Sequence, residues 1–503
     1  MPSAHLTLDP HFRIGPVHRR VFGSFVEHLG RCVYDGLYEP GHPSADEDGF
    51  RTDVLELVRE LGVSAIRYPG GNFVSGYRWE DGVGPREQRP RRLDLAWHSV
   101  ETNQVGLHEF ARWNEKAGSE LILAVNLGTR GVLEALDLLE YSNVRSGSTL
   151  SEQRVADGTE EPFAVKMWCL GNEMDGPWQL GHRSAEDYGK IAAQTAKAMR
   201  QLDPGVELVV CGSSSAQMPT FGSWERTVLE HTYDDVDFIS CHAYYFEKDG
   251  DLASFLASAV DMDHFIESVV ATADHVKAAL GKDKTINIAF DEWNVWYQDR
   301  FHAEDQITDI EQWPYAPRLL EDQYHVADAV VFGNLLISLL KHADRVTSAS
   351  LAQLVNVIAP IMTEPGGQAW RQTTFFPFAL TSRLARGNAL RLELTCDTYD
   401  TARFGAVPLI DAVATHDPET GRVAVFLVNR GLEGPSTVTI DLRGLGDVSV
   451  LESHTLHDDD VYAANTLAEP TRVEPTENKS VRLEGGLLTL ELPPVSWTAL
   501  SLG

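Results

Sequence analysis

The sequence predicts an α/β protein in which a (β/α)8 TIM barrel is followed by a C-terminal all-β sandwich of jelly-roll type. Two observations carry this prediction. Eight short β-branched and apolar runs alternate with helical patterns up to about residue 380, and strand patterns alone follow after that point. Strands that alternate with helices form a parallel sheet, and eight of them close into a barrel. A chain of 503 residues is long enough for both domains.

Each predicted barrel strand is a short apolar run that ends in polar residues or glycine, as expected where a strand meets a turn. The eight runs span residues 21–27, 64–71, 120–128, 163–173, 207–214, 237–244, 286–292 and 346–353. The clearest helix between them spans residues 184–202 and begins with a capping box of Ser184 and Asp187. Its buried face is predicted to consist of Tyr188, Ile191, Thr195, Ala198 and Leu202.

The sequence divides into a barrel of residues 18–379 and a sandwich of residues 380–503. In the second part no long helical pattern occurs, and an Asp417-Pro-Glu-Thr-Gly421 turn joins two predicted strands. Residues 1–17 contain the alternating segment HLTLD, which comes before the barrel. We therefore expect this N-terminal segment to add one or more strands to the sandwich.

The composition limits the possible partners and the compartment. With 42 basic and 74 acidic residues the net charge is −32, which repels nucleic acid, and a neutral substrate fits this charge best. The N-terminus lacks the pattern of a secretory signal, and the most apolar stretch, residues 326–340, is too interrupted for a membrane span. Five cysteines without a CxxC pair fit free thiols in a reducing compartment. We expect a cytoplasmic protein that binds neither nucleic acid nor membrane.

Polar side chains stand at the carboxyl end of every predicted barrel strand, which is where barrels of this type build their active sites. In chain order they are Glu27, Arg67, Asn126, Asn172 with Glu173, Ser213, His242 with Tyr244, Asp291 with Glu292, and Gln353. Because strand ends border water, polarity alone does not assign a function to these positions.

Glu173 and Glu292 differ from the other strand ends. Each follows an apolar run, and each is followed within six residues by tryptophan. A charged group at the edge of a dry core must be paired with an opposite charge or have a function. Aromatic walls disfavour the charged form of a carboxyl group and raise its pKa, as a general acid requires. On strands four and seven the two carboxyl groups would converge over the barrel mouth. Such a pair performs glycoside hydrolysis, and aromatic neighbours offer flat faces for sugars.

Other interpretations of the two glutamates stay open at this point. Both could be structural ion-pair partners, for instance of Arg67. Carboxylates at strand ends also hold magnesium in many barrels, but the other ends supply amides, a tyrosine and one histidine in place of further acids. No HxH pair marks a zinc site, and no glycine-rich nucleotide-binding motif follows a strand. We therefore expect no metal and no cofactor.

Five motifs resemble one known family. They are GSFVEHLGRCVYDGLY, RYPGGNFVSGYRWEDGVGP, WCLGNEMDGPWQ, FDEWNVWY and LAQLVNVIAPI. In this order they are similar to the α-L-arabinofuranosidases of glycoside hydrolase family 51, which belong to clan A of the retaining barrel glycosidases. The resemblance runs from about residue 18 to residue 380. It implies that the catalytic glutamates stand at the ends of strands four and seven, where the strand-end pattern had already located a pair.

The resemblance also implies roles for individual residues. Glu173 matches the general acid/base and Glu292 the nucleophile of a double displacement, with the two carboxyl groups about 5 to 5.5 Å apart. Asn172 would hold the sugar hydroxyl next to the reacting carbon. The remaining arabinose hydroxyls would be bound by Glu27, Asn72 and Gln353.

The resemblance implies supporting roles for a further group of residues. Tyr244 would lie beside the nucleophile, and Arg67 would keep that carboxylate ionised. The tryptophans Trp97, Trp178 and Trp296 would form walls of the pocket. We interpret His242 as a structural hydrogen-bonding residue and Asp175 as a hydrogen-bonding residue of the loop.

The implied substrates are oligosaccharides of the arabinan or arabinoxylan type with terminal α-L-arabinofuranosyl residues, and the implied assembly is a homo-oligomer, either a hexamer or a trimer of dimers. Three alternatives remain. The chain could be another clan A glycosidase such as an endoglucanase or a β-xylosidase, a metal-dependent barrel lyase or isomerase, or a chain whose β-rich tail only binds sugars.

Overall fold

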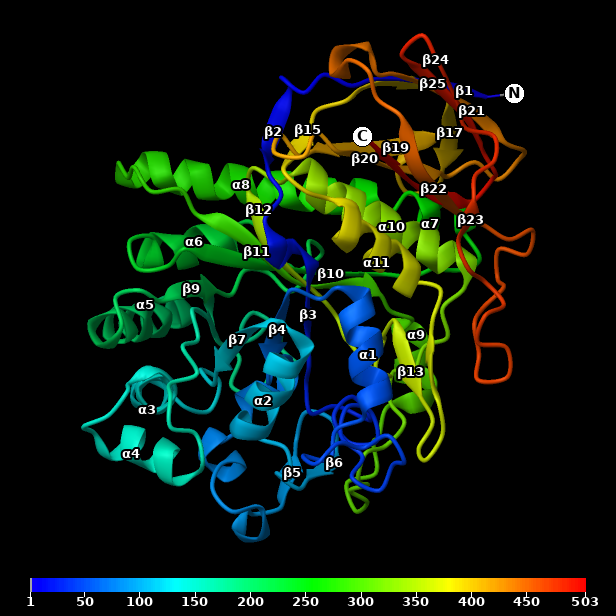
Figure 1. Ribbon diagram of the computed structural model, residues 1–503. Coiled ribbons are helices and arrows are strands. Elements are labelled where there is room, and N and C mark those ends of the chain that lie inside the picture. Colours follow the sequence, from blue (N-terminus) through cyan, green and yellow to red (C-terminus); the bar gives the residue numbers. More distant parts are fainter. Residues whose placement is uncertain (1) are drawn as a thin grey trace.

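The computed structural model describes residues 2–503 and contains a closed barrel of eight parallel strands (Figure 1). In chain order the strands are β3 (Gly23–Phe25), β4 (Ala65–Tyr68), β7 (Glu120–Val125), β8 (Met167–Leu170), β9 (Glu207–Val210), β10 (Phe238–Tyr245), β11 (Asn287–Val295) and β12 (Val346–Leu351). Each of the eight predicted runs coincides with one of these strands, although β10 extends one residue and β11 three residues beyond its run. The barrel closes where β12 pairs with β3, so residues at the two ends of the barrel sequence become neighbours.

A helix follows every barrel strand and covers the outside of the barrel. These helices are α1 (Thr52–Leu61), α2 (Leu107–Ala117), α3 (Val132–Asn143), α5 (Ala185–Leu202), α6 (Ser223–Thr232), α8 (Ala259–Leu280), α10 (Val326–Lys341) and α11 (Phe375–Leu384). Shorter helices α4 (Thr149–Ala156), α7 (Leu252–Leu256) and α9 (Gln298–Arg300) lie in the loops. The prediction of α5 is confirmed at its start, where the Ser184 hydroxyl accepts a hydrogen bond from the Asp187 amide. Its predicted face is wrong at the end, because Leu202 is exposed and Met199 is buried instead.

The second domain consists of two sheets that pack face to face. One sheet has the order β16 (Glu393–Cys396), β1 (Ser3–Thr7), β21 (Ser436–Asp441), β25 (Leu487–Leu492) and β24 (Arg482–Glu484). The other has the order β2 (Arg13–Pro16), β15 (Asn388–Leu390), β19 (Ile410–His416), β20 (Val423–Asn429), β26 (Ser496–Leu502), β22 (Val450–Leu456) and β23 (Thr476–Glu477). Both N-terminal strands thus lie in this domain, and β1 runs parallel to β21. Figure 1 shows β1 and the C-terminus of the chain in this domain.

The two domains meet where α10 packs against β19, β20 and β26. Buried polar side chains cross this contact and satisfy one another. Arg430 donates to Asn334 Oδ1 at 2.6 Å and to Asp411 Oδ2 at 2.9 Å, and the Asn334 amide donates to the same Asp411 oxygen at 2.8 Å. Beside them Gly333 lets the helix approach the indole ring of the fully buried Trp497.

We expect the substitution Gly333→Ala to lower the free energy of unfolding by about 1 to 3 kcal/mol, as overpacking of a tight core does. A Cβ atom at this position would overlap the ring of Trp497, which has no room to withdraw. Thermal unfolding measures the effect. Gly41→Ala is the control, since a Cβ atom there meets no other atom within 4 Å. Equal midpoints for the two variants would contradict the tight contact.

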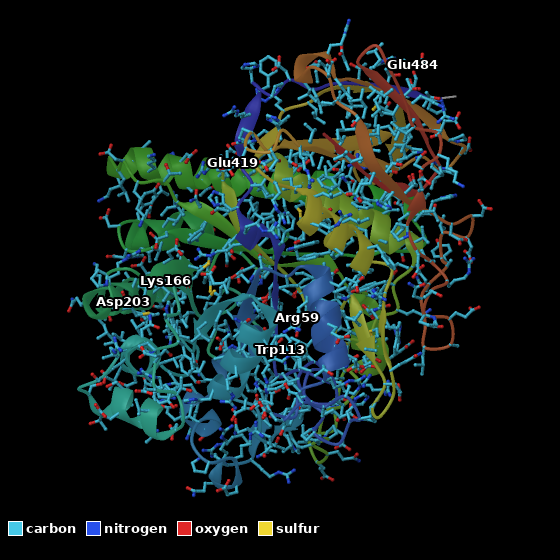
Figure 2. All side chains as sticks on the ribbon, in the orientation of Figure 1. Arg59, Trp113, Lys166, Asp203, Glu419 and Glu484 are labelled. Atoms are coloured by element: carbon cyan, nitrogen blue, oxygen red, sulfur yellow. The ribbon has the colours of Figure 1, made fainter. Side chains whose placement is uncertain are left out.

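Charged side chains of both signs lie on the surface. Exposed charged side chains such as Lys166 on the barrel and Glu484 on the sandwich stand at the outside of the molecule, whereas Trp113 is buried (Figure 2). All five cysteines are free, as the sequence predicted. Within residues 2–503, no helix combines the length and the apolar character needed to cross a membrane.

Candidate active site

Glu173 and Glu292 come together at the carboxyl end of the barrel. Glu173 follows β8, and Glu292 lies in β11. One oxygen of each carboxyl group and a ring nitrogen of His242 all lie within 4.8 Å of one another. Inverting glycosidases need about 6.5 to 9.5 Å between their carboxyl groups to admit a water molecule, so the separation fits the shorter, retaining arrangement. Both side chains are buried, with 9% of Glu173 and 4% of Glu292 exposed.

The carboxyl group of Glu292 is held by two donors. The Tyr244 hydroxyl donates to Oε2 at 2.7 Å, and Arg67 donates to Oε1 at 3.0 Å. Burial raises the pKa of Glu292, and the charge of Glu173 adds to the increase. His242 and Arg67 act in the opposite direction without reversing it. The expected stabilising effect of Arg67 on the ionised form is therefore present, but the net shift of this pKa is upward.

The carboxyl group of Glu173 also has both oxygens engaged. The Trp178 indole donates to Oε2 at 2.6 Å, and His242 Nδ1 lies 2.8 Å from Oε1. The backbone of Glu173 has a φ of 44°, in the left-handed region that residues other than glycine rarely adopt. Such conformations persist where the surroundings fix them, and they cluster at active sites. Asp175 lies in the same loop and accepts two hydrogen bonds from Ser214, as expected of a hydrogen-bonding loop residue.

Asp291 is predicted to stand at the end of its strand but has no predicted role. Its Oδ1 lies 2.9 Å from His242 Nε2, and its Oδ2 lies 3.5 Å from Arg67 Nε. Consecutive residues of a regular strand point to opposite faces. Here the pairing of β11 shifts between Phe290 and Trp293, and such a bulge re-aims neighbouring side chains. Asp291 and Glu292 can therefore both reach the same two cations.

A second group of polar side chains gathers around Glu27, which follows β3. Its Oε1 accepts from the Phe73 amide and from the Trp97 indole, both at 2.8 Å, and its Oε2 accepts from the Gln353 amide at 3.0 Å. Burial raises the pKa of Glu27 to about 8. Gln353 follows β12, and the closure of the barrel between β12 and β3 brings it next to Glu27. Trp97, which is predicted to form a wall of the pocket, thus makes a hydrogen bond to Glu27.

Asn172 and Asn72 lie between these two groups. Arg67 donates to Asn172 Oδ1 at 2.5 Å, which leaves the amide nitrogen of Asn172 on the side of Asn72, at 3.4 Å from its Oδ1. Asn172 and Glu173 are therefore positioned by different partners. The amide groups of both asparagines can reach sugar hydroxyls placed between Glu27 and the two catalytic candidates.

Aromatic rings line one side of the site. The ring of Trp296 lies 5.0 Å from that of Tyr244 in an edge-to-face contact, and Phe301 contacts both Trp296 and Trp97. No pattern in the sequence indicates Phe301, because it lies in the loop after β11 rather than at a strand end. Trp178 is 53% exposed and stands at the mouth, above Glu173.

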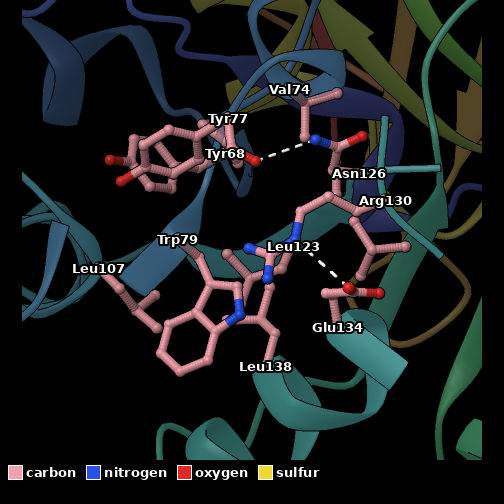
Figure 3. A pocket seen from close by; sticks show the side chains of 13 residues that line it. Tyr68, Val74, Tyr77, Trp79, Leu107, Leu123, Asn126, Arg130, Glu134 and Leu138 are labelled. Atoms are coloured by element: carbon pink, nitrogen blue, oxygen red, sulfur yellow. Dashed lines mark hydrogen bonds and ion pairs between the residues drawn. The ribbon is translucent and has the colours of Figure 1, made fainter. Parts of the chain in front are cut away.

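Two hollows lie near the site. A groove of about 720 Å³ shares Phe73 and Asp94 with the surroundings of Glu27 and extends to Leu180. A cavity of about 30 Å³ lies deeper, between β7 and α3, where Tyr77 and Trp79 form part of its wall (Figure 3). Ligand pockets measure about 300 to 1,000 Å³. The cavity is thus too small for a sugar, whereas the groove has room for part of an oligosaccharide.

The cluster of Glu173, His242 and Glu292 is the one group within residues 2–503 whose spacing would suit a metal ion. The surrounding carboxylates raise the pKa of His242 well above its usual value despite its burial, so a metal ion here would have to displace its proton. Arg67 places a positive charge 3.0 Å from Glu292, which disfavours a further cation beside that carboxylate.

Comparisons with known proteins agree with this geometry. The family models described as "Alpha-L-arabinofuranosidase 1 domain" and "Alpha-L-arabinofuranosidase C-terminal domain" match residues 57–251 and 291–496. A solved family 51 α-L-arabinofuranosidase from Bifidobacterium longum is 52% identical, with a TM-score of 0.96 and complete coverage of both chains. The chain belongs to glycoside hydrolase family 51. The family that the motifs predicted is thereby confirmed, and with it the α-L-arabinofuranosidase activity.

Two curated relatives of this α-L-arabinofuranosidase are both 60% identical to it. An exo-α-(1→6)-L-arabinofuranosidase from Bifidobacterium longum is 60% identical over 509 residues, which cover 99% of this chain and 97% of the relative. An intracellular exo-α-(1→5)-L-arabinofuranosidase from Streptomyces lividans is 60% identical over 502 residues, which cover 99% of this chain and 75% of the relative. The two names differ in the linkage that is cleaved.

Proposed function

We propose that the enzyme releases terminal α-L-arabinofuranosyl residues by a double displacement in which Glu292 is the nucleophile and Glu173 the acid/base. The separation of the two carboxyl groups, with oxygens within 4.8 Å, is the observation that supports this assignment best. Glu292 is held by Tyr244 and Arg67, which fixes the direction of attack. Glu173 has the exposed Trp178 beside it, so it faces the side from which a leaving chain departs.

In the first step Glu292 attacks the anomeric carbon while the bond to the leaving oxygen breaks. The proton of Glu173 goes to that oxygen, and an arabinofuranosyl ester of Glu292 forms. In the second step Glu173 takes a proton from water, the water oxygen attacks the same carbon, and the ester bond to Glu292 breaks. L-arabinose leaves with the configuration of the substrate, because each step inverts the carbon once.

We infer that Glu27, Asn72, Asn172 and Gln353 bind the hydroxyl groups of the arabinose ring, and that Trp296 supplies an apolar wall. The indole nitrogen of Trp296 is buried without a partner in the protein, which leaves it free to donate to a bound sugar. The groove that runs from Phe73 to Leu180 takes the rest of the chain, because it adjoins both the Glu27 group and the loop after Glu173.

An assay of released L-arabinose tests this function. We expect 4-nitrophenyl α-L-arabinofuranoside to be hydrolysed and 4-nitrophenyl β-D-xyloside to be hydrolysed at least about a hundredfold more slowly, since a site built to bind particular hydroxyls rejects a sugar that misplaces them. Arabino-oligosaccharides of two to five residues with (1→5) or (1→6) linkages are compared in the same assay. A preference for the xyloside, or products longer than one arabinose, would contradict the exo-arabinofuranosidase proposal.

The surroundings of the enzyme are also proposed. We place it in the cytoplasm, because relatives of similar length are named intracellular and because its cysteines are free. The homo-oligomer, a hexamer or a trimer of dimers, stays a prediction of the resemblance, and sedimentation velocity would measure it.

A further inference from the structure

Asp291 is buried behind the two catalytic candidates, with only 4% of the residue exposed. It contacts neither Glu173 nor Glu292 by a hydrogen bond. Instead it reaches both through a cation: His242 lies between Asp291 and Glu173, and Arg67 lies between Asp291 and Glu292. Asp291 is therefore placed to act on both carboxyl groups while touching no substrate.

Both ring nitrogens of His242 are committed. Nε2 faces Asp291 at 2.9 Å, and Nδ1 lies 2.8 Å from Glu173 and 3.5 Å from Glu292. The Asp291 carboxylate holds a proton on Nε2 of His242. The other nitrogen, Nδ1, then influences the protonation of Glu173, which it faces. On the opposite side, Arg67 Nε has Asp291 as its nearest charged partner and makes no hydrogen bond of its own.

The charges of this buried cluster balance only when Asp291 is included. Before the reaction Glu292 and Asp291 are negative, Arg67 and His242 are positive, and Glu173 carries its proton, so the sum is zero. After the first step Glu292 is a neutral ester and Glu173 is ionised, so the sum is again zero. A net charge in a dry site is costly. Without the charge of Asp291 the cluster would reach neutrality only by losing a proton.

We propose that Asp291 is a positioning residue that supplies the permanent negative charge of this cluster, and that it thereby keeps the proton on Glu173 available for the leaving oxygen. The proposal rests on the proposed roles of Glu173 and Glu292. Burial raises the pKa of Asp291, but Arg67 and His242 outweigh burial and lower it overall, so the carboxyl group stays ionised. In return the carboxylates raise the pKa of His242.

The other titratable groups around the cluster are the same in the wild type and in the variants described next. Cys169 of β8 lies 3.8 Å from Asp291, and burial raises the pKa of its thiol to about 12, so it is neutral. Tyr244 of β10 is neutral because burial raises its pKa further. Asp175 faces His242 from the loop after β8, and burial raises its pKa to about 6. Glu27 after β3 interacts with Glu292, and burial raises its pKa to about 8.

The test is the pH dependence of kcat/KM on (1→5)-linked arabinotriose, whose leaving group requires protonation. In Asp291→Asn the cluster gains one positive charge, so the acid loses its proton more readily. We expect the alkaline limb of the kcat/KM profile to shift to a pH lower by about 1 unit, with KM little changed. In His242→Gln the cluster loses a positive charge, and the alkaline limb should move up. Opposite shifts from two neighbouring residues are the signature of charge balance.

Asp263→Asn is the matched control, because Asp263 also pairs with a lysine and a histidine but lies away from the site. It should leave the pH profile unchanged. If Asp291→Asn lowers activity by the same factor at every pH, or if both site variants shift the limb in the same direction, the proposal is wrong. Its failure is distinguishable from that of the proposed function, which is tested separately by the kinetics of the Glu173 variant. If Asp291→Asn does not fold, Asp291→Ala, which removes the same charge, takes its place in the comparison with His242→Gln.

Discussion

Replacement of Glu292 by alanine is expected to remove activity on every substrate, aryl glycosides included, by about 10⁴-fold or more, as loss of a catalytic nucleophile does. The physical reason is that no other group takes its place. Glu173 is oriented toward the leaving side by Trp178, and Asp291 lies behind His242 and Arg67. Rates of arabinose release from 4-nitrophenyl α-L-arabinofuranoside and from arabinotriose measure the loss.

A covalent readout separates chemistry from misfolding. With Glu292 present, acid quenching during turnover of an aryl substrate should leave an arabinofuranosyl group on the peptide that contains residues 287–295, detected by mass spectrometry. The Glu292→Ala variant should show no such adduct while it keeps the wild-type unfolding midpoint. An adduct on a different residue, or residual activity above about one percent of the wild type, would overturn the assignment of the nucleophile.

Much of this site could be predicted because the carboxyl ends of all eight barrel strands lie on the same face of the barrel. Each apolar run ends at the same face, so Glu27, Arg67 and Gln353 converge although they are far apart in sequence. The residue at the end of each apolar run can be identified from the local sequence. The closing of eight strands into a barrel then brings these residues together at one face.

The features that escaped prediction depend on departures from regular geometry. The contacts of Asp291 with His242 and Arg67 follow from a shift in strand pairing, and no sequence pattern indicates the left-handed backbone conformation of Glu173. Phe301 comes from a loop whose path is set by packing against Trp97 and Trp296. The parallel pairing of β1 with β21 joins segments more than four hundred residues apart, and no periodicity within either segment specifies the partner.

Replacement of Glu173 by alanine should give a different pattern from loss of Glu292. On arabino-oligosaccharides we expect kcat/KM to fall by about 10² to 10⁴-fold, because the departing alkoxide then leaves without a proton. With 4-nitrophenyl or 2,4-dinitrophenyl arabinofuranoside the first step should be largely spared, since these leaving groups are stable as anions. The second step still lacks its base, so a burst of nitrophenol followed by slow turnover is expected in rapid-mixing experiments.

Added azide should restore turnover of the Glu173→Ala variant. Azide needs no general base, and truncation of the side chain leaves space beside Trp178 and His242, the two partners of the lost carboxyl group. The product should be an arabinofuranosyl azide with the configuration of the substrate, because the attack occurs on the ester of Glu292 from the face that Glu173 occupied. Trp178→Phe is the control, since it removes one hydrogen bond to Glu173 and keeps the carboxyl group. If the Glu173 and Glu292 variants respond alike to leaving group and azide, neither carboxyl group has a distinct role, and the double displacement proposed for this pair is wrong.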